Sequence, residues 1–138
     1  MAMINDSVRV HSSTGKAHAA LTEPAGYRGW WSTNCAIGPG VGRESMLYFN
    51  KGGTPVSMRF RIDAIEDNRI RWTCVAHDMP SWVGTTLEWK LAPAGGDVDI
   101  TLVHDGWKDA APDMVKQGWK HFLASLKSYL ETGTGEPW

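Results

Sequence analysis

One cysteine and one histidine are the residues best suited to covalent chemistry in this sequence of 138 amino acids. Cys74 and His104 both fall on the apolar side of alternating segments, which predicts that both side chains point inward. A thiolate and an imidazole that react together need to lie about 3 Å apart. A third strand is expected between theirs, which separates the two backbones by roughly 9 to 10 Å. Cys74 is therefore interpreted as a small buried apolar residue, and no catalytic dyad is predicted.

His104 remains as a solitary polar residue at the end of an otherwise apolar strand face. One interpretation is a core histidine that is hydrogen-bonded to Thr85 or to a backbone carbonyl. A second is a donor or acceptor that orients a bound ligand, and a third is a general acid or base. The residues leave these three alternatives open, and His104 is the one candidate for a catalytic residue.

No metal or cofactor is expected. The five histidines show no ligand spacing, and no cluster of cysteine and histidine accompanies them. Gly38, Gly40 and Gly42 have neither the GxGxxG spacing nor a following GK[ST], so they predict a turn instead of a phosphate-binding loop.

Composition excludes several classes of partner. The net charge is −1, from 14 basic and 15 acidic residues, so no overall field attracts nucleic acid or an anionic membrane. No apolar stretch approaches the ~20 residues of a membrane span, and residues 1–10 lack the apolar run of a signal peptide. Cys35 and Cys74 lie far apart without a CxxC motif. We expect a cytoplasmic protein with free thiols, although the spacing alone also permits one disulfide.

A local basic patch is expected on the outer face of one hairpin. It lacks exposed stacking aromatics, and Asp63 and Glu66 interrupt its charge. We interpret it as a solvated surface, with an acidic partner or a second copy of the chain as the alternative. Its members are Arg59, Arg61, Arg69 and Arg71.

Eight tryptophans are the feature that bears most directly on binding. Such rings either fill a core or wall a cavity between a sheet and a helix. We expect a cavity, with Trp30 and Trp31 closing one end and the segment 77–82 bordering another. The expected cavity residues are Trp30, Trp31, Met46, Met58, Phe60, Trp72, Cys74, Thr85, Leu87, Trp89, His104, Trp119 and Phe122.

The elements that would position these residues follow from hydrophobic periodicity. Residues 4–11 alternate as a half-buried strand, and residues 15–21 and 24–31 predict two short helices. From residue 43 the period is two, which predicts an antiparallel meander. A three-residue turn at 67–69, with a left-handed residue at Asn68 or beside it, and a four-residue loop at 93–96 set the register. The expected inward rows are Ala64, Trp72, Leu87, Leu102 and then Ile62, Cys74, Thr85, His104.

The last element is a long amphipathic helix. Pro112 and Asp113 suit a helix start, and Gly133 suits its end. The apolar stripe is Val115, Gly118, Trp119, Phe122, Leu123, Leu126, Tyr129 and Leu130. We therefore expect one α+β domain over residues 1–138, structured over about 3–132, with a loose tail at 133–138.

Four segments carry a family resemblance: ALTEP at 20–24, RGWWS at 28–32, HDGW at 104–107 and GWKHFLASLKSYLETGTG at 118–135. Together they resemble the domain related to activators of the ATPase of the 90-kDa heat-shock chaperone. That family belongs to the helix-grip, START-like (SRPBCC) superfamily. The resemblance implies a strongly curved antiparallel sheet that grips the C-terminal helix, often with a hydrophobic cavity between them.

The leading functional hypothesis is a small cytoplasmic binding protein without a dedicated catalytic group. Its cavity would accept an apolar or aromatic molecule, with His104 as the polar anchor. One alternative is a chaperone-related protein-interaction module that binds no small ligand. Another is a cyclase- or hydrolase-like enzyme that uses His104 and a pocket water. The protein is expected to be a monomer or a weak homodimer.

Overall fold

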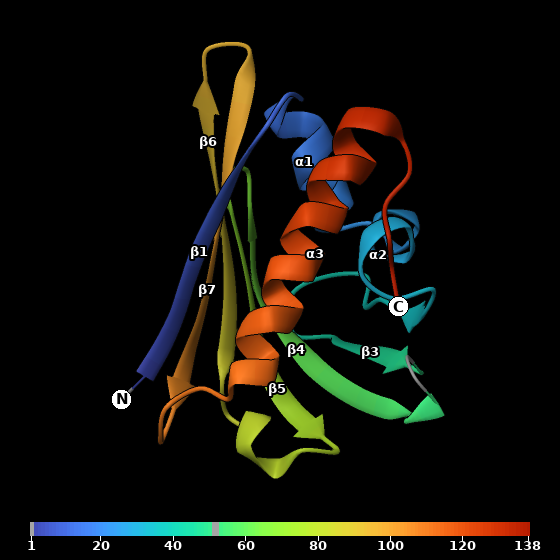
Figure 1. Cartoon of the computed structure of the whole chain (residues 1–138), viewed down its shortest axis with the longest axis vertical. Coiled ribbons are helices and arrows are strands. Elements are labelled where there is room, and N and C mark those ends of the chain that lie inside the picture. Colours follow the sequence, from blue (N-terminus) through green and yellow to red (C-terminus); the bar gives the residue numbers. More distant parts are fainter. Residues whose placement is uncertain (1, 51–52) are drawn as a thin grey trace.

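The computed structural model describes residues 2–50 and 53–138 and shows a bent antiparallel sheet with a long helix on its concave face (Figure 1). In the described residues the strand order is β1-β7-β6-β5-β4-β3-β2. The elements in chain order are β1 (Ala2–Val10), α1 (Thr14–Ala20), α2 (Pro24–Trp30), β2 (Asn34–Ala36), β3 (Glu44–Phe49), β4 (Val56–Glu66), β5 (Arg69–His77), the 3₁₀ turn η2 (Pro80–Trp82), β6 (Thr86–Ala94), β7 (Asp97–Trp107) and α3 (Asp113–Thr132).

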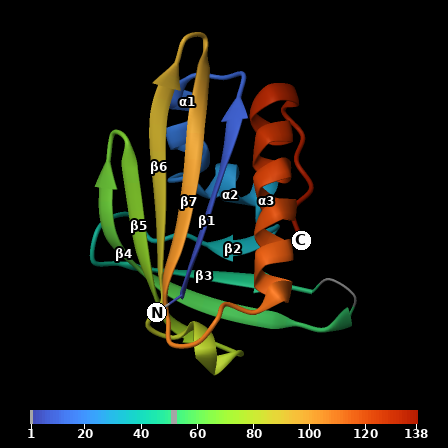
Figure 2. The same cartoon turned by 60° about the vertical axis from the view of Figure 1, so that its left-hand side comes forward.

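The sheet bends strongly between its two halves. Strands β1, β7 and β6 run alongside α3, whereas β3 and the adjoining part of β4 run across its lower end (Figure 2). The expected α+β helix-grip architecture is confirmed, including the two short helices after the first strand. Because the sheet turns under the helix, the lower end of α3 faces the ends of several strands instead of one flat face.

The predicted register is wrong in both hairpins: β4–β5 is shifted by one residue at the turn and by two residues beyond Asp63, and β6–β7 is shifted by two residues. The β4–β5 turn has two residues, Asp67 and Asn68, and a bulge at Asp63 restores the inward facing of the strand. No described residue other than glycine has a positive φ, so the left-handed turn residue is also wrong. In the second hairpin the strands continue to a two-residue turn at Gly95, so Leu91 pairs with Ile100. The observed inward row is Ile62, Trp72, Leu87, His104.

Helix α3 follows the predicted pattern closely. Pro112 is its N-cap residue, and Gly133 ends it in the left-handed conformation at φ 87°. Residues on one side of the helix are buried against the sheet: Val115, Trp119, Phe122, Leu123, Ser125 and Leu126. Among the described residues, no helix is long and apolar enough to cross a membrane.

The segment 133–138 is packed, so the prediction of a loose tail is wrong. The backbone N–H of Trp138 donates to the carbonyl of Trp31 at 3.0 Å, and Thr33 N–H donates to the carbonyl of Trp138 at 3.3 Å. Buried Ser125 donates to the carbonyl of Trp30 at 2.8 Å and accepts from the N–H of Glu136 at 2.7 Å. Local sequence patterns do not predict these contacts, because they join segments that are distant in the chain.

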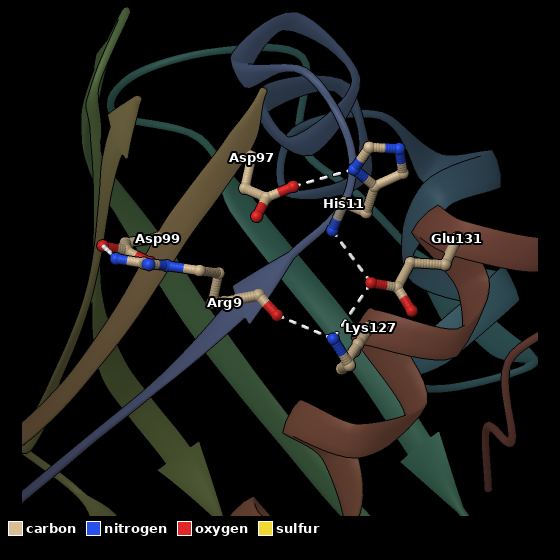
Figure 3. A network of polar contacts seen from close by, with 6 residues as sticks. All are labelled: Arg9, His11, Asp97, Asp99, Lys127 and Glu131. Atoms are coloured by element: carbon tan, nitrogen blue, oxygen red, sulfur yellow. Dashed lines mark hydrogen bonds and ion pairs between the residues drawn. The ribbon is translucent and has the colours of Figure 1, made fainter. Parts of the chain in front are cut away.

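The upper end of β1 is joined to β7 and α3 by polar contacts (Figure 3). The Lys127 ammonium donates to the carbonyl of Arg9 at 2.7 Å, and the Glu131 carboxylate accepts from the backbone N–H of His11 at 2.8 Å. This N–H bond and the nearby Lys127 ammonium lower the pKa of Glu131. The contacts anchor the outermost strand to the helix. The residues drawn are Arg9, His11, Asp97, Asp99, Lys127 and Glu131.

Candidate functional site

A cavity of about 150 Å³ opens at the lower end of α3. Its wall comes from β3, β4, the end of β5, η2, α3 and the C-terminal segment. The aromatic part of the wall consists of Trp31, Phe49, Trp82, Trp119, Phe122 and Trp138. The remainder consists of Val56, Met58, His77, Met79, Met114, Val115 and Gly118. A larger and more polar hollow of about 640 Å³ adjoins it at Phe49, Val56 and Trp138.

The helix leaves space for the cavity at Gly118. A Cβ atom built on this glycine would meet no atom within 4 Å. A residue with a side chain at this position of the apolar stripe would project into the opening. The cavity therefore exists partly because the stripe of α3 has a gap one turn before Phe122.

A closed ring of four tryptophans lies beside the cavity and contributes two residues to its wall. Trp31 stacks on Trp30, with 5.4 Å between ring centroids and 8° between planes. Trp30 meets Trp89 edge-on at 5.5 Å, Trp89 meets Trp119 at 5.7 Å, and Trp119 meets Trp31 at 5.5 Å. Only Trp31 and Trp119 of this ring reach the cavity. Trp30 packs against Trp31, and Trp89 packs against Trp119, so these two buried rings hold the two wall residues in position.

Part of this wall was predicted from the sequence. Four of the predicted residues line the cavity: Trp31, Met58, Trp119 and Phe122. The segment 77–82 also borders it, through His77, Met79 and Trp82. The other buried members of the predicted set lie deeper in the core and do not line the cavity: Trp30, Phe60, Trp72, Cys74, Thr85, Leu87, Trp89 and His104.

Met46 is a wrong prediction. It lies on the outer face of β3 and is 36% exposed, because the alternation of this strand turns Leu47 and Phe49 inward. Phe49 is accordingly a wall residue that period-two alternation could have found. Trp138 is another missed residue, and its position depends on the packing of segment 133–138.

His104 has a partner at each ring nitrogen. The Thr85 hydroxyl donates to the carbonyl of Trp82 at 2.6 Å, so its oxygen accepts from His104 Nε2–H at 2.9 Å. The indole N–H of Trp119 donates to His104 Nδ1 at 3.1 Å. The ring is fully buried, and burial lowers the pKa of His104 to about 3. His104 is thus a neutral imidazole of fixed tautomer without access to the cavity.

The two cysteines are free thiols. Burial raises the pKa of Cys74 to about 11, so this thiol stays protonated and is a poor nucleophile. Its Sγ–H donates to the carbonyl of Ala76 at 3.5 Å, and in the described part of the chain no hydrogen bond joins it to His104. Burial also raises the pKa of Cys35.

His77 and Trp82 lie side by side in the cavity wall. The two rings stack with centroids 4.4 Å apart and planes 16° apart. His77 Nδ1 accepts a hydrogen bond from the backbone N–H of Met79 at 2.8 Å. His77 Nε2 and Trp82 Nε1 are buried and have no hydrogen-bond partner among the described residues. Burial lowers the pKa of His77 to about 4, against the opposing effect of Asp78.

The arginine surface on β4 and β5 is neutralised by carboxylates. Arg59 Nε lies 3.0 Å from Glu44 Oε1, Arg61 Nε lies 2.8 Å from Asp63 Oδ1, and Arg69 Nε lies 2.5 Å from Glu88 Oε1. Arg71 lies 3.9 Å from both Asp63 and Glu88. In residues 2–50 and 53–138, no group of three or more His, Cys, Asp or Glu residues is arranged to hold a metal ion.

Solved structures share this fold over nearly the whole chain. The solution structure of the Aha1 dimer from Colwellia psychrerythraea is 27% identical, with a TM-score of 0.80 over 98% of this chain and 100% of that chain. A protein of Chromobacterium violaceum is 21% identical, with a TM-score of 0.81 over 94% and 96% of the two chains. An AHSA1-like protein from Aeromonas hydrophila is 16% identical, with a TM-score of 0.73 and 94% of each chain covered.

A comparison with curated proteins finds no match. The family comparison is decisive, because residues 12–131 match the family described as activator of Hsp90 ATPase homolog 1-like protein. This range begins two residues after β1 and runs almost to the end of α3, so it includes most of the sheet and the long helix. The chain therefore belongs to the activator of Hsp90 ATPase homolog 1-like family, within the START-like helix-grip fold.

Proposed function

We propose that this protein binds a small, predominantly apolar molecule with an aromatic ring in the cavity beneath α3. The observation that carries the proposal is an open hollow of about 150 Å³ whose wall is made of aromatic rings, thioethers and aliphatic groups. An apolar cavity of roughly this volume accommodates a benzene-sized molecule. The proposed compartment is the cytoplasm, where unpaired thiols such as Cys35 and Cys74 are usual.

The expected affinity is modest. At about 0.6 kcal/mol per non-hydrogen atom, a ligand of eight or nine such atoms gains about 5 kcal/mol, which corresponds to a Kd of roughly 0.2 mM. A ligand that extends into the adjoining polar hollow would bind more tightly. We propose binding and not catalysis, because His104 lies outside the cavity and both its nitrogens are hydrogen-bonded.

A cavity-filling variant tests this proposal. Gly118→Leu adds a side chain where α3 leaves open space, and leucine is a better helix former than glycine. We expect the variant to be at least as stable as the parent and to lose affinity for toluene by tenfold or more, measured by NMR titration.

Lys120→Leu is the matched control, because it adds the same side chain to an exposed position of the same helix. It should bind toluene as the parent does. Equal toluene affinity in Gly118→Leu and the parent, or no binding to either, would remove the cavity from the function.

A second candidate function is association with another copy of the chain. The relative from Colwellia psychrerythraea is described as a dimer and is 27% identical over almost the whole length. Met46 and Tyr48 are exposed on the outer face of β3, at 36% and 40%. Sedimentation velocity should show a mass above 15.2 kDa that falls in Met46→Lys/Tyr48→Lys. A single 15.2 kDa species at millimolar concentration would contradict this candidate.

A further inference from the structure

Trp138 lies at the boundary between the apolar cavity and the adjoining polar hollow. The described walls of the two hollows share three residues, which are Phe49, Val56 and Trp138. Phe49 and Val56 are paired across β3 and β4, so the hydrogen bonds of the sheet fix their part of the boundary. Trp138 belongs to neither a helix nor a strand, and it supplies the part of the boundary that the sheet does not hold.

The position of the Trp138 indole is fixed by its backbone and by two rings of α3. Its N–H donates to the carbonyl of Trp31 at 3.0 Å, and its carbonyl accepts from the N–H of Thr33 at 3.3 Å. The indole stacks on the imidazole of His121, with 4.5 Å between centroids and 25° between planes. It also meets the ring of Phe122 edge-on at 4.7 Å. The boundary is therefore ordered, although it lies outside the regular elements.

His121 acts on this boundary through Trp138 and not as a wall residue. It is absent from the described walls of both hollows. Its Nε2 lies 2.8 Å from the carbonyl oxygen of Glu136, and a carbonyl can only accept, so Nε2 carries the proton. One imidazole thus holds the segment 133–138 twice, by a hydrogen bond at Glu136 and by ring stacking at Trp138.

The two hollows differ in size and in the groups that they offer. The apolar cavity has a volume of about 150 Å³, and the polar hollow has about 640 Å³. The polar side chains of the second hollow belong to half-buried or exposed residues, so a ligand that entered it could reach them: Thr33, Asn34, Tyr48, Asn50, Ser57 and Asp78. A ligand with a ring and a long polar chain could use both hollows only if the Trp138 indole moved aside. Forcing extra groups into filled space displaces side chains at a cost in free energy.

We propose that Trp138 selects ligands by size: with its indole in place, the cavity accepts single-ring molecules about as large as toluene and excludes those with a longer chain. This inference rests on the proposed binding function and adds the size class of the ligand. The tighter binding expected of a ligand that reaches the polar hollow is withheld until the indole moves aside. Displacement of the segment 133–138 would therefore change which molecules the cavity accepts.

The test compares toluene with 4-phenyl-1-butanol, which carries the same ring on a four-carbon chain that ends in a hydroxyl. Both are titrated by NMR against the parent and Trp138→Ala. We expect 4-phenyl-1-butanol to bind the variant at least about tenfold more tightly than the parent, since each newly buried methylene improves the Kd about fourfold. Toluene should bind the variant roughly threefold to tenfold more weakly, because it loses contact with the indole. A general loosening of the structure would weaken both.

Tyr129→Ala is the matched control, because it also removes a half-buried ring but lies in the described wall of neither hollow. It should leave the ratio of the two affinities unchanged. His121→Ala removes the ring on which Trp138 stacks and no wall atom. It should shift the ratio in the same direction as Trp138→Ala, by a smaller factor.

A measurement on the parent needs no variant. Bound toluene should show intermolecular nuclear Overhauser effects to the indole protons of Trp138. If Trp138→Ala failed to fold, this measurement and His121→Ala would decide together. Bound toluene without such effects, or an unchanged ratio in His121→Ala, would then contradict the proposal.

The outcomes separate this inference from the binding function. If neither probe binds the parent, the binding function fails and the inference fails with it. If toluene binds the parent and both affinities fall together in Trp138→Ala, the cavity is a binding site but Trp138 does not select by size. Binding of 4-phenyl-1-butanol to the parent tenfold more tightly than toluene would also overturn the inference, since the chain would then pass the indole unhindered.

Discussion

His104 and His77 both pack against tryptophan rings, but they differ in how many of their ring nitrogens are hydrogen-bonded. His104 is sealed between Thr85 and Trp119, with a partner at each ring nitrogen. His77 lies at the edge of the cavity, with one nitrogen bonded to its own loop and the other unpartnered among the described residues. The same residue type therefore has both ring nitrogens hydrogen-bonded in one region and keeps one unsatisfied ring nitrogen in the other.

The difference shows which polar groups are informative about binding. A buried group whose hydrogen bonds are satisfied within the chain has no capacity left for a ligand, however central its position. An unsatisfied group contributes binding energy only where a ligand can reach it, and His77 Nε2 is buried. The two regions are the ring of four tryptophans with His104 and the cavity wall around His77.

The largest contrast is expected in stability. Trp30→Ala removes a fully buried ring whose indole N–H donates to the carbonyl of Ala20 at 2.8 Å. We expect a loss of about 3 to 5 kcal/mol in the free energy of unfolding. Met114→Ala, at a side chain in the cavity wall that is 67% exposed, should cost less than about 0.5 kcal/mol. Urea denaturation measures both, and similar losses would contradict the division into two regions.

The second contrast is in pH dependence. Unfolded histidine takes up a proton near pH 6.5, whereas buried His104 does so at about 3. Between these values the unfolded state binds more protons, so acidification destabilises the fold. The expected loss from His104 is about 2 kcal/mol between pH 7 and pH 5.

His104→Gln checks this assignment, because its amide can donate toward Thr85 and accept from Trp119 without titrating. Its free energy of unfolding should fall less steeply over the same pH range. Some slope should remain, because burial lowers the pKa of His77 in the same direction. If the free energy of unfolding of His104→Gln depended on pH as steeply as that of the parent, burial would not be what keeps His104 unprotonated.

A third prediction concerns the C-terminal segment that completes the wall. A Cβ atom at Gly135 would lie 2.4 Å from the carbonyl oxygen of Gly29, so Gly135→Ala must displace the segment. We expect a loss of about 1 to 3 kcal/mol by urea denaturation. Gly96→Ala is the control, because a Cβ atom there meets nothing within 4 Å. Equal stability of the two variants would mean that the segment contributes little.

The smallest effect on stability is expected from an ion pair on the outer surface of the sheet. It provides a reference value for the stability changes in the two regions. Arg59 and Glu44 form an ion pair at 3.0 Å, with side chains 44% and 49% exposed. A double-mutant cycle with Arg59→Met and Glu44→Gln should give a coupling energy below about 1 kcal/mol. A larger coupling, or one insensitive to salt, would assign this surface a structural role.

Local sequence patterns predicted the helices and strands of the fold. They did not predict the strand register or which residues line the cavity. The stripe of α3 and its end at Gly133 follow from local periodicity and capping, which act within a few residues. The strand register depends on turn length, and the bulge at Asp63 has no clear sequence signal. A shift of two residues keeps every side chain on its face but changes its neighbours. His104, expected opposite Thr85, therefore pairs with Leu87, and Cys74 pairs with Phe60 instead of Ile62.

The candidate site was predicted less well than the fold. Trp31, Met58, Trp119 and Phe122 were identified because apolar periodicity places them inward. Periodicity cannot separate a wall residue from a core residue, since both face the same way. The unpartnered nitrogen of His77 follows from a loop hydrogen bond to Met79, which no pattern of residue types encodes.

The ring of four indoles also has an optical consequence. Chromophores this close exchange excitation faster than they emit, so light absorbed at Trp30 or Trp89 can be emitted from Trp31 or Trp119. A quencher that touched only one rim of the ring would then darken all four. Coupled transitions of neighbouring rings should also add a near-ultraviolet circular dichroism signal, which would vanish together with the ring on unfolding.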